Sequence, residues 1–150
     1  LGKHKGLRQL GLDPWSKKLT AGILKLKFDA RKIPIKTALL DQKIIAGLGN
    51  IYASEILFDA GINPMIPANK LSKGKLSAII QSMRKILSLA LKYNGTSISD
   101  YRRVDEKQGM FQNFLKVYGK ADQKCLNCSS KIEKIVQNQR STFLCPLCQK

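Results

Sequence analysis

The chain has 150 residues, 43% of them hydrophobic, and its formal net charge at pH 7 is +17. A chain of this length can bury one ordinary hydrophobic core or form two small modules. It shows no signal peptide and no apolar run long enough to span a bilayer, so we expect a cytoplasmic location and no membrane partner. The positive excess favours a polyanionic partner, because lysine and arginine release counterions when they neutralise phosphates; a merely solvated basic surface is the alternative.

Residues 1–19 are basic and contain several glycines, and they predict a connector that lies against something else rather than an independent fold. Trp15 is expected to anchor this connector on the helices that follow it. His4, the only histidine, lies between two lysines near the beginning of the chain and is expected to be solvated rather than a ligand or a base.

The next segment predicts two short helices. Thr20 can cap a helix from residue 21 to about residue 30, although the alternation of apolar residues over 24–28 also fits a strand. Pro34 suits the first turn of a second helix over residues 33–42. Three cations at the beginning of this helix oppose its dipole, which indicates that they serve a partner, or else that they are solvated. They are Arg31, Lys32 and Lys36.

Residues 47–52 (Gly-Leu-Gly-Asn-Ile-Tyr) predict a tight turn that leads into a helix over residues 50–60. Gly61 fits the left-handed position after this helix, and Pro64 prevents its continuation. The first N–H groups of a helix have no acceptor within it, so such a turn can bind an anion. On the local pattern alone, a glycine turn between two packed helices explains these residues equally well.

A longer helix is predicted over residues 72–93, where apolar residues recur at helical spacing. Residues 96–124 show no clear period, and the part that mixes arginines with aromatic residues predicts either a functional loop or a linker. Flipped nucleobases are commonly held by loops of this kind, but the composition does not specify one.

All four cysteines fall in the last 26 residues, in two pairs: Cys125 with Cys128 and Cys145 with Cys148. This spacing matches the four-cysteine zinc pattern, because a gap of two residues lets one tight turn aim both sulfurs at a tetrahedral ion. We expect one structural Zn²⁺, since about 26 residues cannot bury enough apolar surface to fold alone. Iron–sulfur or redox chemistry is the alternative for the same cysteines.

The residues between the two cysteine pairs predict a β-hairpin over 131–144 with a turn at 137–139. Arg140 is expected at the tip of this hairpin. A rigid ribbon tip can place a guanidinium against a phosphate, whereas an ordinary exposed arginine is the plain alternative. The expected fold is mostly α-helical, followed by a small four-cysteine zinc-finger β-hairpin.

The order of these motifs resembles the C-terminal portion of bacterial formamidopyrimidine-DNA glycosylases, which remove oxidised purines from DNA. The family's helix–two-turn–helix signature is followed by residues 40–42 (Leu-Asp-Gln), 46–55 (Ala-Gly-Leu-Gly-Asn-Ile-Tyr-Ala-Ser-Glu) and 60–64 (Ala-Gly-Ile-Asn-Pro). Its zinc-finger signature is followed by residues 117–119 (Val-Tyr-Gly) and 140–149. The resemblance implies a helix–two-turn–helix DNA-binding domain over residues 20–95, a base-closing loop or linker over 96–115 and a zinc finger over 116–150.

The resemblance also implies roles for single residues. Asn50 and Arg140 would bind phosphates that flank a nucleotide extruded from double-stranded DNA with an oxidised base or an abasic site, and Lys32 would contact the DNA nearby. Arg140 also matches the proton donor of the family's second elimination step, which makes it the catalytic candidate. Residues 101–111 would close over the damaged base. The protein would act as a monomer at the bacterial nucleoid.

The sequence departs from the family pattern at its beginning. The family's chemistry uses an N-terminal proline amine and an adjacent glutamate, whereas this chain starts Leu-Gly-Lys. We therefore expect residues 1–19 to be a connector from an absent N-terminal lobe, and the 150 residues to bind DNA without catalysis. Ser129 replaces a glycine at a position where positive φ is helpful. Two other classes stay open: a non-catalytic DNA- or RNA-binding zinc module, and a zinc-ribbon protein of the translation machinery.

Overall fold

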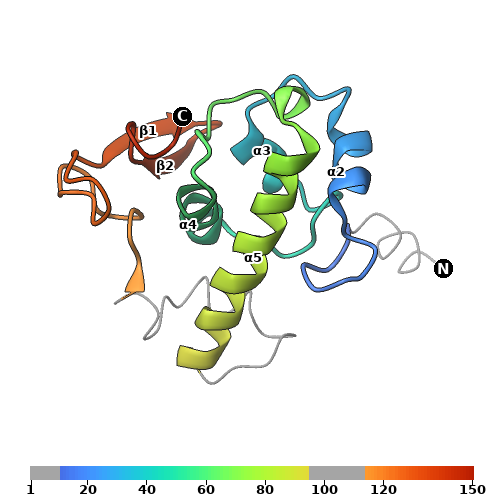
Figure 1. Cartoon of the computed structure of the whole chain (residues 1–150), viewed down its shortest axis with the longest axis horizontal. Coiled ribbons are helices and arrows are strands. Elements are labelled where there is room, and N and C mark those ends of the chain that lie inside the picture. Colours follow the sequence, from blue (N-terminus) through green and yellow to red (C-terminus); the bar gives the residue numbers. More distant parts are fainter. Residues whose placement is uncertain (1–10, 95–113) are drawn as a thin grey trace.

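The computed structural model describes residues 11–94 and 114–150. The elements over these residues are the helices α2 (Ala21–Phe28), α3 (Ile35–Leu39), α4 (Asn50–Ala60) and α5 (Lys73–Asn94), the short 3₁₀ helix η1 (Ala68–Lys70), and the antiparallel strands β1 (Glu133–Gln137) and β2 (Arg140–Leu144). Helix α4 lies between α5 and the hairpin (Figure 1). The expected fold class, mostly helical with a small hairpin near the C-terminal end, is confirmed.

Helix α2 forms where Thr20 was expected to cap it. The Thr20 hydroxyl accepts a hydrogen bond from the N–H of Ile23 at 3.2 Å, which satisfies one of the first-turn donors. Leu24 and Phe28 are fully buried in the helical core. Because they are four residues apart, they share one face of a helix. In a strand, Leu26 would lie on the same face as both of them, but Leu26 is exposed.

Helix α3 is shorter than the predicted helix over residues 33–42. Pro34 is its N-cap residue rather than part of its first turn, and the helix ends at Leu39. Beyond it, the carboxylate of Asp41 accepts a hydrogen bond from the N–H of Lys43 at 2.9 Å, which stabilises a turn. A turn stabilised by the side chain of Asp41 thus takes the place of the last part of the expected helix.

The side chain of Gln42 organises the tight turn before α4. Its amide nitrogen donates to the carbonyl oxygens of Leu40 and Leu48, at 3.2 and 3.1 Å, and its amide oxygen accepts the N–H of Gly47. Gly47 has a φ of 82°, which favours glycine. These contacts hold the turn closed and fix the direction in which the chain enters α4.

Helix α4 begins at Asn50 and is followed by Gly61 in the left-handed conformation, as predicted. Residues 50–58 are all buried, because α5 packs on one side of the helix and β2 on the other. At Gly61, φ is 72°, and a Cβ built there would lie 3.4 Å from the carbonyl oxygen of Cys148. The end of α4 therefore lies beside the last cysteine.

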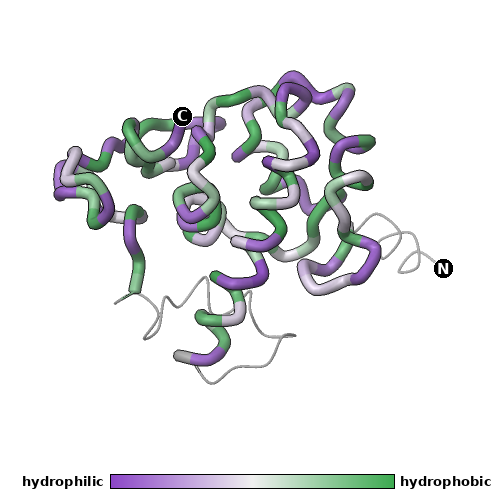
Figure 2. Tube along the Cα trace, viewed as in Figure 1, coloured by the Kyte–Doolittle hydropathy of each residue, from purple (hydrophilic) through white to green (hydrophobic). Residues whose placement is uncertain are grey.

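Helix α5 carries one buried stripe, which the predicted helix over residues 72–93 also required. Along α5 the hydropathy changes repeatedly between hydrophobic and hydrophilic (Figure 2). The buried hydrophobic side chains are Leu76, Ile79, Ile80, Met83, Ile86, Leu87 and Ala90. Within the described residues, no helix has the length and apolar composition needed to cross a membrane.

Two hydrophobic clusters lie on either side of α4. The larger one joins the helices. The smaller one lies beneath the hairpin and consists of Phe58, Val117, Cys125, Ile132, Phe143 and Cys145. Phe58 comes from α4, so this helix contributes to both clusters.

Residues 11–19 pack along the helical part of the molecule, as expected of a connector. The N–H of Gly11 donates to the carbonyl of Gln42 at 2.7 Å, and the carbonyl of Leu12 accepts the N–H of Ala46 at 2.9 Å. Trp15 packs against the helical core, in agreement with the expected anchor. Residues 1–10, which include His4, lie outside the described part of the chain.

Candidate nucleic-acid interface and metal site

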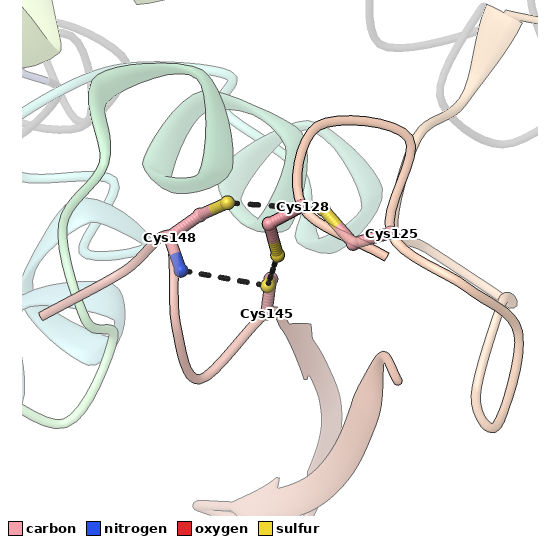
Figure 3. A group of neighbouring side chains, drawn as sticks. All are labelled: Cys125, Cys128, Cys145 and Cys148. Atoms are coloured by element: carbon pink, nitrogen blue, oxygen red, sulfur yellow. Dashed lines mark hydrogen bonds between the residues drawn. The ribbon is translucent and has the colours of Figure 1, made fainter. Parts of the chain in front are cut away.

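The four cysteines converge on one point from two turns (Figure 3). One turn precedes β1 and the other follows β2. The sulfur atoms of Cys125 and Cys148 are 3.8 Å apart, those of Cys128 and Cys145 are 3.4 Å apart, and all four lie within 4.8 Å of one another. A tetrahedral zinc ion with Zn–S distances of about 2.3 Å separates its ligands by roughly 3.8 Å. The geometry and the all-sulfur donor set therefore fit a structural zinc site.

Backbone geometry supports this cluster at each turn. The N–H of Asn127 donates to the sulfur of Cys125 at 3.4 Å, and the N–H of Cys148 donates to that of Cys145 at 3.5 Å. Ser129 has a φ of 64°, which confirms the positive φ expected at this position.

Arg140 is the first residue of β2 and is exposed to solvent. It pairs with Gln137 across a two-residue loop in which Asn138 and Gln139 have φ values of 49° and 65°. Two consecutive positive φ values are typical of the tight hairpin turn that matches the twist of paired strands. The hairpin and its turn are as predicted, and Arg140 stands directly after the turn.

Lys36 joins three elements at a buried point near Arg140. Its side chain is only 1% exposed, and its ammonium donates to the amide oxygen of Asn50, to the hydroxyl of Thr142 at 2.7 Å and to the carbonyl of Ser141 at 3.1 Å. Burial first, and then the positive charge of Arg140, lower the pKa of Lys36 to about 8. The group thus ties α3, the start of α4 and β2 together.

Asn50 is 6% exposed, and its side chain forms hydrogen bonds with other parts of the protein. Its amide oxygen accepts from Lys36, and its amide nitrogen donates to the carbonyl of Ser141 at 3.0 Å. The same nitrogen lies 3.5 Å from the hydroxyl oxygen of Tyr118, at the limit of a hydrogen bond. An amide nitrogen carries two protons, so one of them is held only weakly.

A surface pocket of about 320 Å³ opens between α3 and the hairpin. Three of its lining residues are cationic: Arg31, Lys36 and Arg140. The N–H of Lys43, and then the guanidinium of Arg31 paired with the carboxylate at 2.7 Å, keep the pKa of Asp41 below its usual value. The pocket therefore presents mainly positive charge.

Lys32 does not line this pocket. It is exposed on the segment that precedes α3, beside Arg31 and outside the network around Lys36. The structure thus brings Asn50 and Arg140 close to each other through Lys36, and leaves Lys32 on the neighbouring surface. Residues 101–111, the expected base-closing loop, lie outside the described residues.

Glu55 is a second buried charged residue, and it binds the segment that leads to the cysteines. Its carboxylate is 2% exposed and accepts the backbone N–H groups of Lys116, Val117 and Tyr118 at 2.8, 2.9 and 2.8 Å. Burial raises the pKa of Glu55, and the three N–H donors oppose that effect. Tyr118 also packs edge-on against Phe143 of β2, with ring centroids 4.8 Å apart.

Sequence reasoning noted Lys36 only as a cation at a helix start and gave Glu55 no role of its own. Both bind residues far away in the chain: Lys36 lies 105 positions from Ser141, and Glu55 lies 61 from Lys116. Local patterns carry no information on such contacts. The one available signal is position: Lys36 lies three residues before Leu39 and Glu55 four residues after Ile51, so each charge shares a helix face with an apolar residue.

Comparisons with known proteins agree with this geometry. The model of the formamidopyrimidine-DNA glycosylase H2TH domain matches residues 10–102, and that of the zinc finger found in FPG and IleRS matches residues 122–150. The formamidopyrimidine-DNA glycosylase of Carboxydothermus hydrogenoformans is 45% identical over 142 residues, and that of Rickettsia conorii is 44% identical over 143 residues. These matches cover 95% of this chain and 54% and 52% of the two relatives.

Solved structures show the same fold. Lactococcus lactis Fpg in complex with DNA that contains an abasic site superposes with a TM-score of 0.84 and 34% identity, over 99% of this chain and 54% of that protein. A complex of the same protein with FAPY-dG-containing DNA gives a TM-score of 0.84 and 33% identity. The chain spans about half the length of the relatives it matches. It belongs to the formamidopyrimidine-DNA glycosylase family, of which it carries the H2TH domain and the zinc finger.

Proposed function

We propose that this chain binds double-stranded DNA that contains an oxidised base or an abasic site, as the H2TH and zinc-finger part of a DNA glycosylase with AP lyase activity. The observation that supports it most is the network in which buried Lys36 joins Asn50 to the strand that carries Arg140. One side chain thereby sets the distance between two residues whose family counterparts bind DNA phosphates. The solved relatives in complex with damaged DNA support the same partner.

Each residue has a physically distinct part in this proposal. The exposed guanidinium of Arg140 contacts a phosphate, with Lys32 adding positive charge on the neighbouring surface. Asn50 contributes the amide proton that it shares only weakly with Tyr118, together with the N-terminal end of α4, which favours an anion. Arg140 is also the proton donor of the second elimination step when the complete catalytic machinery is present.

We further propose one Zn²⁺ per chain, held by Cys125, Cys128, Cys145 and Cys148. The ion is structural, because four thiolates leave no open coordination position for a substrate. It keeps the two turns at the base of the hairpin together and thereby fixes the direction of β2. The chain is proposed to act as a monomer in the bacterial cytoplasm, at the nucleoid.

Equilibrium binding of the zinc-loaded chain to a duplex with one abasic-site analogue tests the proposal. We expect affinity to fall steeply with salt, and Arg140→Ala to weaken binding and reduce the salt slope by about 1. Lys134→Ala, an exposed cation on β1, is the matched control. Equal binding by Arg140→Ala and the wild type, or a preference for duplex RNA, would contradict the proposal.

A further inference from the structure

Glu55 differs from every other acidic residue in the described ranges. The other acidic residues that form ion pairs have side chains that are at least 15% exposed, and the remaining ones are exposed on the surface. Glu55 is 2% exposed, and among the described residues no lysine or arginine side chain forms a salt bridge with it. Its hydrogen-bond partners in this part of the chain are the backbone N–H groups of residues 116–118. A buried carboxylate with such partners holds a chain segment in place rather than a side chain.

The segment that Glu55 holds is the entry to the metal-binding module, which we define as residues 114–150. Val117 is fully buried in the small cluster beneath the hairpin. Tyr118 contacts Phe143 on β2 and lies near the side chain of Asn50. Val117 and Tyr118 thus connect the carboxylate of Glu55 to the hairpin, which carries Arg140, and to the side chain of Asn50.

Other polar contacts also join the helices to the module. The amide nitrogen of Asn50 donates to the carbonyl of Ser141 at 3.0 Å, and the ammonium of Lys36 donates to Ser141 and Thr142. The hydroxyl of Ser54 accepts the N–H of Phe143 at 3.4 Å, and at the far end the amide nitrogen of Gln149 donates to the carbonyl of Ile62 at 3.0 Å. These contacts hold β2 and the C-terminal end, whereas Glu55 holds residues 116–118 through charge-assisted hydrogen bonds, which are roughly twice as strong as neutral ones.

We propose that Glu55 is a positioning residue for DNA binding: by fixing residues 116–118 on α4, it acts together with Lys36 to set the position of Arg140 relative to the N-terminal end of that helix. This inference rests on the proposed function, because it assumes that Arg140 contacts a phosphate. Metal binding alone cannot set that position, since all four cysteines belong to the module and none to the helical part.

Because Glu55 is negatively charged, a positioning role and a purely electrostatic role predict opposite changes in DNA affinity when the charge is removed. Removing a carboxylate from a DNA-binding chain reduces repulsion of phosphates, so a purely electrostatic role predicts that Glu55→Gln binds DNA more tightly. Positioning predicts the reverse. A glutamine has one acceptor oxygen, and its NH₂ group would face backbone N–H donors, so at least one of the three hydrogen bonds is lost.

The experiment compares affinity for an abasic-analogue duplex among zinc-loaded wild type, Glu55→Gln and Asp59→Asn. Asp59 is the matched control, because it is one turn further along α4 but is paired with Ser82 and Lys85 of α5, away from the module. We expect Glu55→Gln to bind about tenfold more weakly, the effect of about one charged hydrogen bond. Asp59→Asn is expected to bind equally or slightly better. Glu55→Asp keeps both acceptor oxygens and is expected to recover part of the loss.

A double-mutant cycle with Arg140→Ala separates positioning from general destabilisation. If Glu55 acts through Arg140, Glu55→Gln costs little further affinity in the Arg140→Ala background. Measurements are made well below the unfolding temperature, with zinc content and circular dichroism confirming the folded state, and Glu55→Asp replaces Glu55→Gln if the latter does not fold. Unchanged or tighter binding by the Glu55 variant, or additive losses in the cycle, would overturn the proposal. Failure of the wild type to bind DNA would instead refute the proposed function.

Discussion

At the scale of single residues, Lys36 is a buried titratable group beside the proposed binding surface. Its pKa is lowered from 10.5 to about 8, first by burial and then by the charge of Arg140. Below about pH 8 the group is charged in both the folded and the unfolded chain. Between this value and 10.5, the folded chain has released the proton and the unfolded chain retains it, so stability rises with pH in this window.

Lys36 therefore predicts a pH dependence of DNA binding. A phosphate beside Arg140 offsets the positive charge that lowers the pKa of Lys36, so the complex holds the proton more tightly than the free chain. Affinity is expected to be full below about pH 8 and to fall as the pH rises above it. The measurement is the dissociation constant across pH 7 to 9.5 at constant ionic strength, a range chosen around the shifted pKa. Lys36→Met should weaken binding and remove this dependence; a persistent dependence in the variant would assign it to another group.

Ser129 predicts a gain in stability on substitution by glycine. Its φ of 64° is unfavourable for a residue with a Cβ, and its side chain is exposed. Ser129→Gly should increase the free energy of unfolding by about 1 kcal/mol, because glycine adopts this conformation without steric cost. Thermal unfolding of the zinc-loaded chain measures the change. The same substitution at Ser130, which has no positive φ, is the control and should lower stability or leave it unchanged.

At the scale of elements, α4 contributes side chains to both hydrophobic clusters. One hydrophobic cluster joins the helices, and the other lies beneath the hairpin and receives Phe58 from α4. The helices can therefore keep their core when the hairpin is lost. The converse does not hold, because the small cluster contains two of the cysteines, Cys125 and Cys145, and depends on the metal for its assembly.

Cys145→Ser is accordingly expected to unfold the module and leave the helices folded. A zinc site with one ligand removed binds its ion far less tightly, and little apolar surface remains to stabilise the hairpin. Metal analysis should find about one zinc in the wild type and a loss in the variant, with most of the helical circular dichroism retained. Cys145 is fully buried, so Leu147→Ser at an exposed position of the same turn is the control. Loss of the helical signal together with the zinc would show that the two clusters fold as one.

At the scale of the whole molecule, Arg84 joins the connector to the longest helix. Its guanidinium donates to the carbonyl oxygens of Pro14, Ser16 and Leu19, at 2.9, 3.0 and 3.3 Å. Carbonyl oxygens in a short irregular segment need such donors, because no regular secondary structure provides them. Arg84 is thus half-buried and binds the connector rather than solvent alone.

Arg84→Ala is expected to loosen residues 11–19 and to lower the free energy of unfolding by about 1–3 kcal/mol, the cost of leaving carbonyl oxygens without donors. Trp15 is the only tryptophan and packs on the helical core, so its fluorescence should shift to longer wavelength in the variant. Gln81→Ala, at an exposed site on the same helix, should leave the spectrum unchanged. An unshifted spectrum in Arg84→Ala would mean that packing of Trp15 alone holds the segment.

What the sequence predicted correctly was encoded locally. The bounds of α4 follow from glycines on either side of it, the metal site follows from two short cysteine spacings, and the hairpin follows from the strand propensity between them. The shortened α3 was missed because the chain turns at Asp41, whose carboxylate accepts a hydrogen bond from the N–H of Lys43. The roles of Lys36, Glu55 and Arg84 were missed for a different reason. Each depends on which distant backbone atoms the fold brings near, and no local pattern specifies them.

The length of the turn between β1 and β2 determines which face of the hairpin carries Arg140. Side chains of a strand alternate between its two faces, so Arg140 shares a face with Thr142, which contacts Lys36. A loop one residue longer or shorter would shift the register and turn Arg140 to the opposite face. Relatives with an altered loop length here would need their phosphate-binding charge at another position, so loop length and charge position should have changed together during evolution.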